Sequence, residues 1–131
     1  MIKVIDDKEY EVLVDWWNRH KFANLPKQFL PSTGYIAYIN DIPIVAGFLY
    51  IPKTGKIGWV EWVVKNPDST SEQMDIGYKE LMDTIINTAK EDGVDVLFVS
   101  LRNKSYQARL EGVGFFVTDE NATNMLLNIG G

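Results

Sequence analysis

The chain has 131 residues, 46% of them hydrophobic, and no cysteine. This length and composition predict one globular domain, residues 1–131, that buries its own core. The lack of cysteine excludes disulfides, thiolate metal sites and a cysteine nucleophile, and the lone histidine, His20, leaves no histidine-based metal site. No apolar run reaches the roughly 20 residues of a membrane span, and the first residues do not form a signal peptide, so we expect a cytoplasmic protein.

The charge is uneven along the chain. Residues 1–65 carry eight basic and seven acidic side chains, whereas residues 66–131 carry five basic and eleven acidic ones. No stretch concentrates lysine or arginine as a nucleic-acid surface does, so nucleic acid is not an expected partner. The acidic second half also opposes the binding of phosphate groups.

The first half of the chain predicts a strand, a helix and three further strands. Residues 2–5 form the first strand, and an amphipathic helix with Asp6 as its N-cap extends to His20. Two prolines between residues 24 and 33 leave a short second helix or an ordered loop. The three strands that follow are 35–39, 44–51 and 57–64. Because Asn40-Asp41 tolerates left-handed turns, we expect a hairpin and then an antiparallel meander.

The hydrophobic period changes after Pro67. From Tyr78 to Ala89, apolar residues recur at i, i+3, i+4, i+7, i+8 and i+11, which predicts a helix with one apolar stripe. Residues 94–101 are almost entirely apolar and predict a buried strand.

The last part of the chain predicts one helix and two strands. Asn103 is a suitable cap for a short helix that carries Tyr106 and ends at Gly112. Residues 115–118 and 125–129 are predicted as strands. The expected order is β-α-α-β-β-β-α-β-α-β-β, an α+β fold in which helices cover a mixed sheet.

Glu61 is the only charged residue in the apolar strand that ends at Val64. On a regular strand it shares a face with Trp59 and Val63, while Trp62 points the other way. Such neighbours raise the pKa of a carboxylate, which suits a base that takes a proton from an ammonium substrate. The alternative is a glutamate on a partly exposed face or in a pair with lysine. Most of the four tryptophans are expected in the core, with one or two left for an acceptor site.

A capping box precedes the long helix, formed by Thr70 with Gln73 or by Ser69 with Glu72. Capping alone explains these residues. The functional alternative is that the free amides of this helix end, with Gln73 as a neutral donor, hold phosphate oxygens.

Two segments carry motifs of a known family. The segment from Asn103 to Gly114-Phe115 opens with Asn and closes with Gly-Phe, and the strand from Trp59 leads through Asn66-Pro67 into the long helix. These segments resemble the late helix and the cofactor-binding strand, loop and helix of the GNAT superfamily of N-acetyltransferases, which bind acetyl-CoA where two central strands splay apart. The pair Trp16-Trp17, with the segment from Leu30-Pro31 to Gly34 before the hairpin, resembles segments of small GNAT-like proteins found in phage genomes.

The resemblance implies acetyl-CoA as cosubstrate and gives residues roles. Glu61 matches the strand position of the general base in some members. Leu110 stands where many members have a tyrosine acid, and Tyr106, one helical turn earlier on the same face, is the candidate replacement. The residues expected to contact the cofactor are Val63, Val64, Lys65, Gln73, Gly77 and Asn103.

The cofactor loop departs from the family pattern. That pattern is Gln or Arg, two residues, Gly, one residue, and Gly or Ala, because glycines let backbone amides approach the pyrophosphate. With Gly77 at the last small position, Glu72 replaces the Gln or Arg and Asp75 replaces the first glycine. Each ionised carboxylate roughly 5 to 8 Å from the phosphates costs on the order of 1 kcal/mol.

The expected function is transfer of an acyl group, most simply acetyl, from CoA to a primary amine of a small molecule or peptide by direct attack in a ternary complex. The acidic charge balance favours a cationic acceptor. The alternative is a catalytically degenerate GNAT-fold protein that serves as a binding or phage virion-associated module. No metal, nucleic acid or membrane partner is expected, and both monomer and homodimer stay open.

Overall fold

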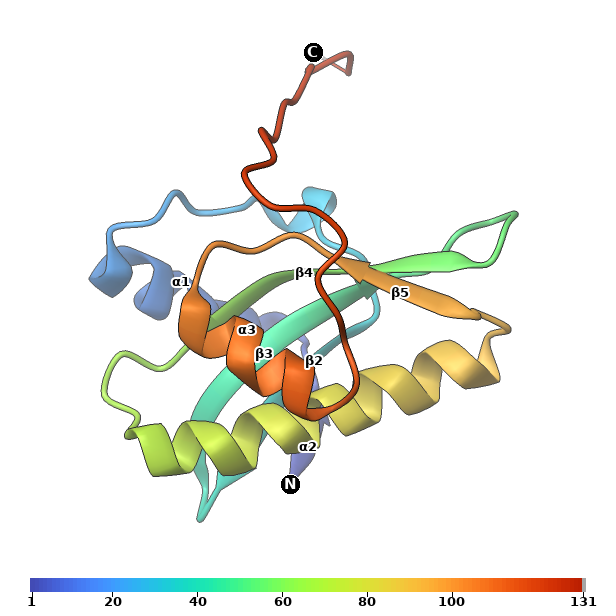
Figure 1. The fold of residues 1–131 in the computed structure, drawn as a ribbon. Coiled ribbons are helices and arrows are strands. Elements are labelled where there is room, and N and C mark those ends of the chain that lie inside the picture. The colour runs from blue at the N-terminus through green and yellow to red at the C-terminus, as the bar shows by residue number, and fades with distance from the viewer. Residues whose placement is uncertain (131) are drawn as a thin grey trace.

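A five-stranded mixed sheet with helices on both faces forms the protein (Figure 1). The structure is a computed structural model and describes residues 1–130. The strands are β1 (Ile2–Val4), β2 (Gly34–Ile39), β3 (Ile42–Tyr50), β4 (Ile57–Lys65) and β5 (Val96–Val99). The helices are α1 (Asp7–His20), α2 (Ser71–Glu91) and α3 (Lys104–Gly112), with a 3₁₀ turn at Lys27–Phe29. The predicted α+β class is confirmed.

The strands lie in the sheet in chain order. The first four pair antiparallel, and β5 joins β4 in parallel. The hairpin between β2 and β3 turns at Asn40 and Asp41, whose φ angles of 50° and 65° are left-handed, so the predicted turn is confirmed. Because parallel neighbours need a crossover, α2 carries the chain from the end of β4 back to the start of β5.

Side-chain caps fix where the helices begin. The carboxylate of Asp6 accepts the amide of Lys8 at 2.9 Å, and Thr70 and Gln73 form the predicted capping box before α2. Between α1 and β2 the chain makes only the 3₁₀ turn. Leu30 is extended there because the residue before a proline is restricted away from helical conformations.

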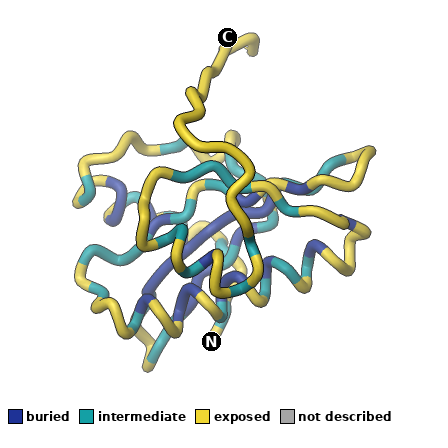
Figure 2. The backbone as a smooth tube through the Cα atoms, viewed as in Figure 1, coloured by how far each residue is buried: buried dark blue, intermediate teal, exposed yellow. Residues whose placement is uncertain are grey.

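Two apolar cores lie on opposite faces of the sheet. Figure 2 shows the buried residues gathered along the strands and on the inner sides of the helices. The core under α2 and α3 contains Ala37, Ile44, Val45, Leu49, Val60, Met74, Tyr78, Leu81, Met82, Ile85, Ala89, Val94 and Leu110. The core under α1 contains Leu13, Trp16, Trp17, Ile36, Ala46, Phe48 and Val64.

A bulge in β4 changes which side chains share a face. Ala46 pairs with Val64 but Phe48 pairs with Glu61, so β4 has one extra residue between these pairs, and Trp62 there has a φ of 60°. As a result Val63 packs against the same core as Val60 although the two are three residues apart. The expectation that Glu61 and Val63 share a face is therefore wrong.

The two strands expected at 115–118 and 125–129 are also wrong. Residues 115–130 contain no strand: Phe115 packs against the core under α2 and α3, residues 116–130 are exposed, and the last residues leave the body as a tail (Figures 1 and 2). The tail turns away at Gly114, which has a φ of 106°. An apolar run forms a strand only where its backbone finds a neighbour to pair with, and in the described part of the chain no backbone group of β5 bonds to the tail.

Candidate functional site

The parallel strands β4 and β5 part in the middle of β4. Their register runs from Ile57 opposite Val96 to Val60 opposite Val99. There β5 ends and the chain turns toward α3, whereas β4 continues to Lys65. Within residues 1–130 the second half of β4 therefore has β3 as its only strand partner, and no strand lies along its other edge.

Glu61 lies at the point where the strands part. Burial raises the pKa of its carboxyl, and the backbone N–H groups of Trp62 and Ser100 and the indole of Trp59 lower it in part. Since Ser100 directly follows β5, the carboxyl touches both strands at their divergence. A carboxylate with a raised pKa in this place accepts a proton more readily than an ordinary glutamate does.

His20, the last residue of α1, binds the last residue of β4. A ring N–H of His20 donates to the carbonyl of Lys65 at 2.9 Å, and the ring stacks on Phe22 with centroids 5.0 Å apart. Val64 is buried in the core under α1, and Val63 packs on the opposite core. Of the three β4 residues expected to contact the cofactor, Lys65 thus has its carbonyl already engaged.

The first turn of α2 has partly satisfied backbone amides. The amide of Gln73 donates to Thr70 Oγ1 at 3.1 Å, and the Gln73 side chain accepts the Thr70 amide at 2.9 Å. For Ser71 and Glu72 the described residues supply no amide partner. Two amides at this helix end are therefore available to an anion.

Gly77 lies in the second turn of α2 and faces the sheet. A Cβ at this position would come within 3.0 Å of Ile44 Cγ2 and 3.5 Å of Val45 Cγ1. The glycine thus lets α2 approach β3 closely. It lies inside the helix, not in the turn that precedes it.

Arginines neutralise two of the acidic residues near this helix end. Arg109 from α3 is 17% exposed, and its Nε lies 3.1 Å from Asp75 Oδ1. Its Nη2 also donates to the carbonyl of Ser71 at 3.3 Å. Arg19 from α1 binds Asp68 in the loop before α2 at 2.6 Å. The repulsion expected from Asp75 is therefore offset by a residue that sequence reasoning missed, although its place three residues after Tyr106 on the same helix is a usable signal.

The start of α3 carries the remaining predicted residues. Asn103 Oδ1 accepts the amides of Ser105 at 2.9 Å and Tyr106 at 3.2 Å, so Asn103 caps the helix as predicted. The ring of Tyr106 packs against Tyr78 of α2 with centroids 5.3 Å apart. Burial raises the pKa of both phenols. Leu110, at the family's tyrosine position, is buried in the core.

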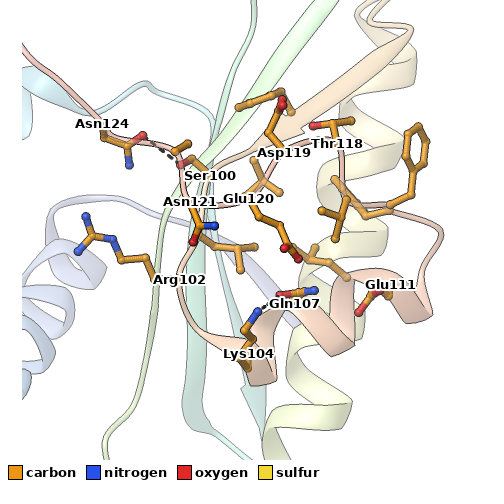
Figure 3. Close-up of a pocket in the computed structure, with 18 residues that line it drawn as sticks. Ser100, Arg102, Lys104, Gln107, Glu111, Thr118, Asp119, Glu120, Asn121 and Asn124 are labelled. Atoms are coloured by element: carbon orange, nitrogen blue, oxygen red, sulfur yellow. Dashed lines mark hydrogen bonds between the residues drawn. The ribbon is translucent and has the colours of Figure 1, made fainter.

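A cavity of about 850 Å³ lies beside the end of β5. Figure 3 shows its wall, formed by the segment 98–102, by α3 and by the tail from residue 115 to 124. Ser100 Oγ donates to Asn124 Oδ1 across it at 3.3 Å. None of the predicted catalytic or cofactor residues lines this cavity, so we do not assign the acyl-transfer site to it.

Residues 1–130 contain no group of three or more histidine, cysteine, aspartate or glutamate side chains arranged to hold a metal ion. No helix in that range has both the length and the apolar character needed to cross a membrane.

Known proteins share this fold. Neither a known family's sequence model nor a curated protein matches the chain. Solved structures do match. The protein TTHA1254 from Thermus thermophilus is 13% identical, with 98% of each chain covered and a TM-score of 0.72. The ribosomal-protein-S18-alanine N-acetyltransferase from Escherichia coli is 16% identical, with 91% of this chain and 79% of that chain covered and a TM-score of 0.73.

A third structure contains coenzyme A. It is the N-acetylglutamate synthase from Neisseria gonorrhoeae complexed with coenzyme A and N-acetyl-glutamate, at 16% identity and a TM-score of 0.67, with 94% of this chain and 30% of that chain covered. The second and third of these neighbours are acetyltransferases, and this chain has the mixed sheet, the parting of central strands and the crossover helix expected of their fold. The chain therefore has the GNAT N-acetyltransferase fold.

Proposed function

We propose that the protein transfers an acyl group, most simply acetyl, from coenzyme A to a primary amine. The observation that carries the proposal is Glu61, a partly buried carboxylate with a raised pKa at the point where β4 and β5 part. The acetyltransferase neighbours with the same fold add support. The whole chain, residues 1–131, would act as one domain.

The surroundings of the strand opening fit the thioester substrate in three respects. The edge of β4 beyond Val60, along which no strand lies, can accept an extended, amide-bearing pantetheine arm in the manner of an added strand. The free amides of Ser71 and Glu72 can receive a phosphate. Arg109 reduces the repulsion that Asp75 would otherwise exert on that phosphate.

The chemistry requires one proton acceptor and one proton donor. Glu61 takes a proton from the ammonium, which frees the lone pair of the nitrogen. The nitrogen bonds to the thioester carbonyl carbon, the carbon–sulfur bond breaks and its electron pair leaves on sulfur. The second nitrogen proton passes to sulfur through the hydroxyl of Tyr106 or through water. The products are the amide, the CoA thiol and a proton held on Glu61.

A second candidate is a GNAT-fold binding module without catalysis. Three observations favour it: the capping box engages the Gln73 side chain, His20 engages the carbonyl of Lys65, and Glu72 forms no ion pair within the described residues. Each of these weakens one contact that the cofactor was expected to make.

Calorimetric titration of the protein with CoA separates the two candidates. Micromolar binding, followed by amine-dependent release of the thiol from acetyl-CoA, is the expected result. No heat at millimolar CoA would overturn the transferase and leave the binding module. CoA binding without thiol release for any primary amine would favour a CoA-binding protein without transferase activity.

A further inference from the structure

One face of the sheet carries large apolar side chains that no helix covers. Ile57 pairs with Val96 and Trp59 with Phe98 across β4 and β5, and all four side chains are exposed. These side chains lie on the face of the sheet that points away from α2. Val60, whose side chain alternates with that of Trp59 along β4, belongs to the core under α2. The helix α1 covers only the other part of this face, over β2, β3 and the end of β4.

Trp62 and Tyr50 extend this surface. Tyr50 pairs with Trp59, so their side chains share a face. The indole N–H of Trp62 donates to Tyr50 Oη at 2.8 Å, and that hydroxyl donates to the carbonyl of Phe29 at 3.1 Å. We name the set of Ile57, Trp59, Trp62, Val96, Phe98 and Tyr50 the aromatic face.

The rings of the aromatic face are held in place by each other. Trp59 and Phe98 pack with centroids 4.4 Å apart. The polar atom of Trp62 is satisfied within the protein, so what it presents outward is mostly apolar ring surface. Trp59 and Trp62 are 41% and 37% exposed, whereas Trp16 and Trp17 are 2% and 3% exposed. Exposed aromatic groups on this scale mark a surface that receives a partner.

Glu61 gives this surface a charge. It precedes the bulge, its carboxyl touches the indole of Trp59, and it forms no ion pair with any lysine or arginine among residues 1–130. No basic residue belongs to the aromatic face, and Lys56 beside it lies 3.7 Å from Asp95. One anionic group among aromatic rings complements an ammonium ion, which gains both the ion pair and the ring quadrupoles.

We propose that the aromatic face is the acceptor site, and that it selects a primary ammonium carried on an aromatic or aliphatic body with no carboxylate beside the nitrogen. The proposal rests on the proposed function. The ammonium lies against Glu61 and a tryptophan ring, and the body of the acceptor covers Trp59 and Phe98. A carboxylate next to the amine would face the carboxylate of Glu61 on a surface whose own side chains include no basic residue, in a protein with a net charge of −5.

The test uses three probes that differ by one feature each. Phenethylammonium has both the cation and the body, phenylalanine adds a carboxylate, and methylammonium lacks the body. Titration of the full chain is followed through the four indole N–H signals in proton–nitrogen NMR spectra. We expect phenethylammonium to shift the Trp59 and Trp62 signals and to leave the buried Trp16 and Trp17 signals in place. Phenylalanine and methylammonium should bind at least about tenfold more weakly.

Substitutions in the aromatic face test whether phenethylammonium binds there. Trp59→Ala and Glu61→Gln should each weaken phenethylammonium binding by about tenfold. Trp59→Phe, which keeps a ring if the alanine variant does not fold, should weaken it less. Leu126→Ala removes a tail side chain that is 88% exposed and serves as the control, with unchanged affinity expected.

The outcomes separate this inference from the proposed function, because CoA binding is measured on the same samples. CoA binding without any shift at Trp59 or Trp62, or with equal affinity for phenethylammonium and phenylalanine, overturns the inference alone. The expected probe ranking without CoA binding overturns the transferase and supports the face as an amine-binding surface. Shifts at Trp59 that follow protein concentration and not probe concentration would show that a second copy covers the face, and would overturn the inference.

Discussion

Arg109 and Asp75 join α3 to the start of α2 through an ion pair with Nε and Oδ1 3.1 Å apart. The sequence around Asp75 alone predicts a site hostile to phosphate, because a carboxylate replaces the glycine of the family pattern. The ion pair offsets the negative charge of Asp75 at this helix end. Whether the helix end can hold the phosphates of CoA therefore depends on a residue 34 positions away in the chain.

Substitution of Arg109 removes the positive charge that offsets Asp75. Arg109→Met leaves Asp75 unpaired, and we expect CoA affinity to fall about fivefold to tenfold, the effect of roughly 1 kcal/mol of uncompensated repulsion. Adding Asp75→Asn to this variant should restore the affinity. Lys79→Met, which breaks the α2 surface pair with Asp83, is the matched control and should leave it unchanged. Calorimetry at low salt gives the dissociation constants of the wild type and the three variants, and equal values for all four proteins would remove Arg109 from the site.

The second prediction concerns turnover. Glu61→Gln keeps the shape of the side chain and removes the proton acceptor, so we expect kcat to fall by roughly 10² to 10⁴ near neutral pH. In the wild type, kcat/KM should rise with pH as the carboxyl ionises, and this limb should begin above the ordinary glutamate range because burial raises the pKa. The limb should be absent from the variant. A pH–rate profile that is the same for both proteins would exclude Glu61 as the base.

Glu61→Gln should lower turnover but raise the stability of the folded protein near neutral pH. A raised pKa means that the folded protein binds the proton of Glu61 more tightly than the unfolded chain does. This stabilising effect is complete below the unfolded pKa and is lost as the pH rises through the folded value. Glu61→Gln should therefore raise the thermal midpoint near pH 7 and make little difference at about pH 3, where the wild-type carboxyl is protonated. A lower midpoint for the variant at pH 7 would show that the ionised form is stabilised by its N–H contacts.

Tyr106 is tested against its neighbour. If its hydroxyl relays the proton to sulfur, Tyr106→Phe should lower kcat by about tenfold to a hundredfold, at or below the low end for general acids because a thiolate leaves well without help. Tyr78→Phe removes the hydroxyl of the ring that packs against Tyr106 and should leave kcat unchanged. CoA affinity should be the same in both variants. Equal rates for Tyr106→Phe and the wild type would reduce Tyr106 to a packing residue and leave proton delivery to water.

Much of this fold follows from local chemistry. The caps Asp6, Thr70 with Gln73, and Asn103 each satisfy backbone amides within three residues, so the sequence contains all that their prediction needs. The turn at Asn40-Asp41 is local in the same sense. Glu61 stands out in the sequence because one charge in an apolar strand is visible without any knowledge of its partners.

The features that the sequence does not predict depend on distant partners. No glycine in the sequence marks the bulge at Trp62. The bulge depends on the register between β4 and β3. The exposed pair of Trp59 and Phe98 depends on the register of two parallel strands and on how far α1 reaches over the sheet. The same limit explains the strands wrongly predicted in the tail, where apolar residues have high strand propensity but no backbone to pair with.

A buried leucine of α2 and an exposed leucine of the tail should contribute very differently to the free energy of unfolding. Leu81 is fully buried between α2 and the sheet, whereas Leu126 is 88% exposed. Leu81→Ala leaves a cavity in the core and should lower the free energy of unfolding by about 2 to 5 kcal/mol. Leu126→Ala should change it by less than about 0.5 kcal/mol, since little contact with the body is lost. Urea unfolding of the two variants measures both values, and a loss of more than about 1 kcal/mol for Leu126→Ala would mean that the tail packs against the protein in solution.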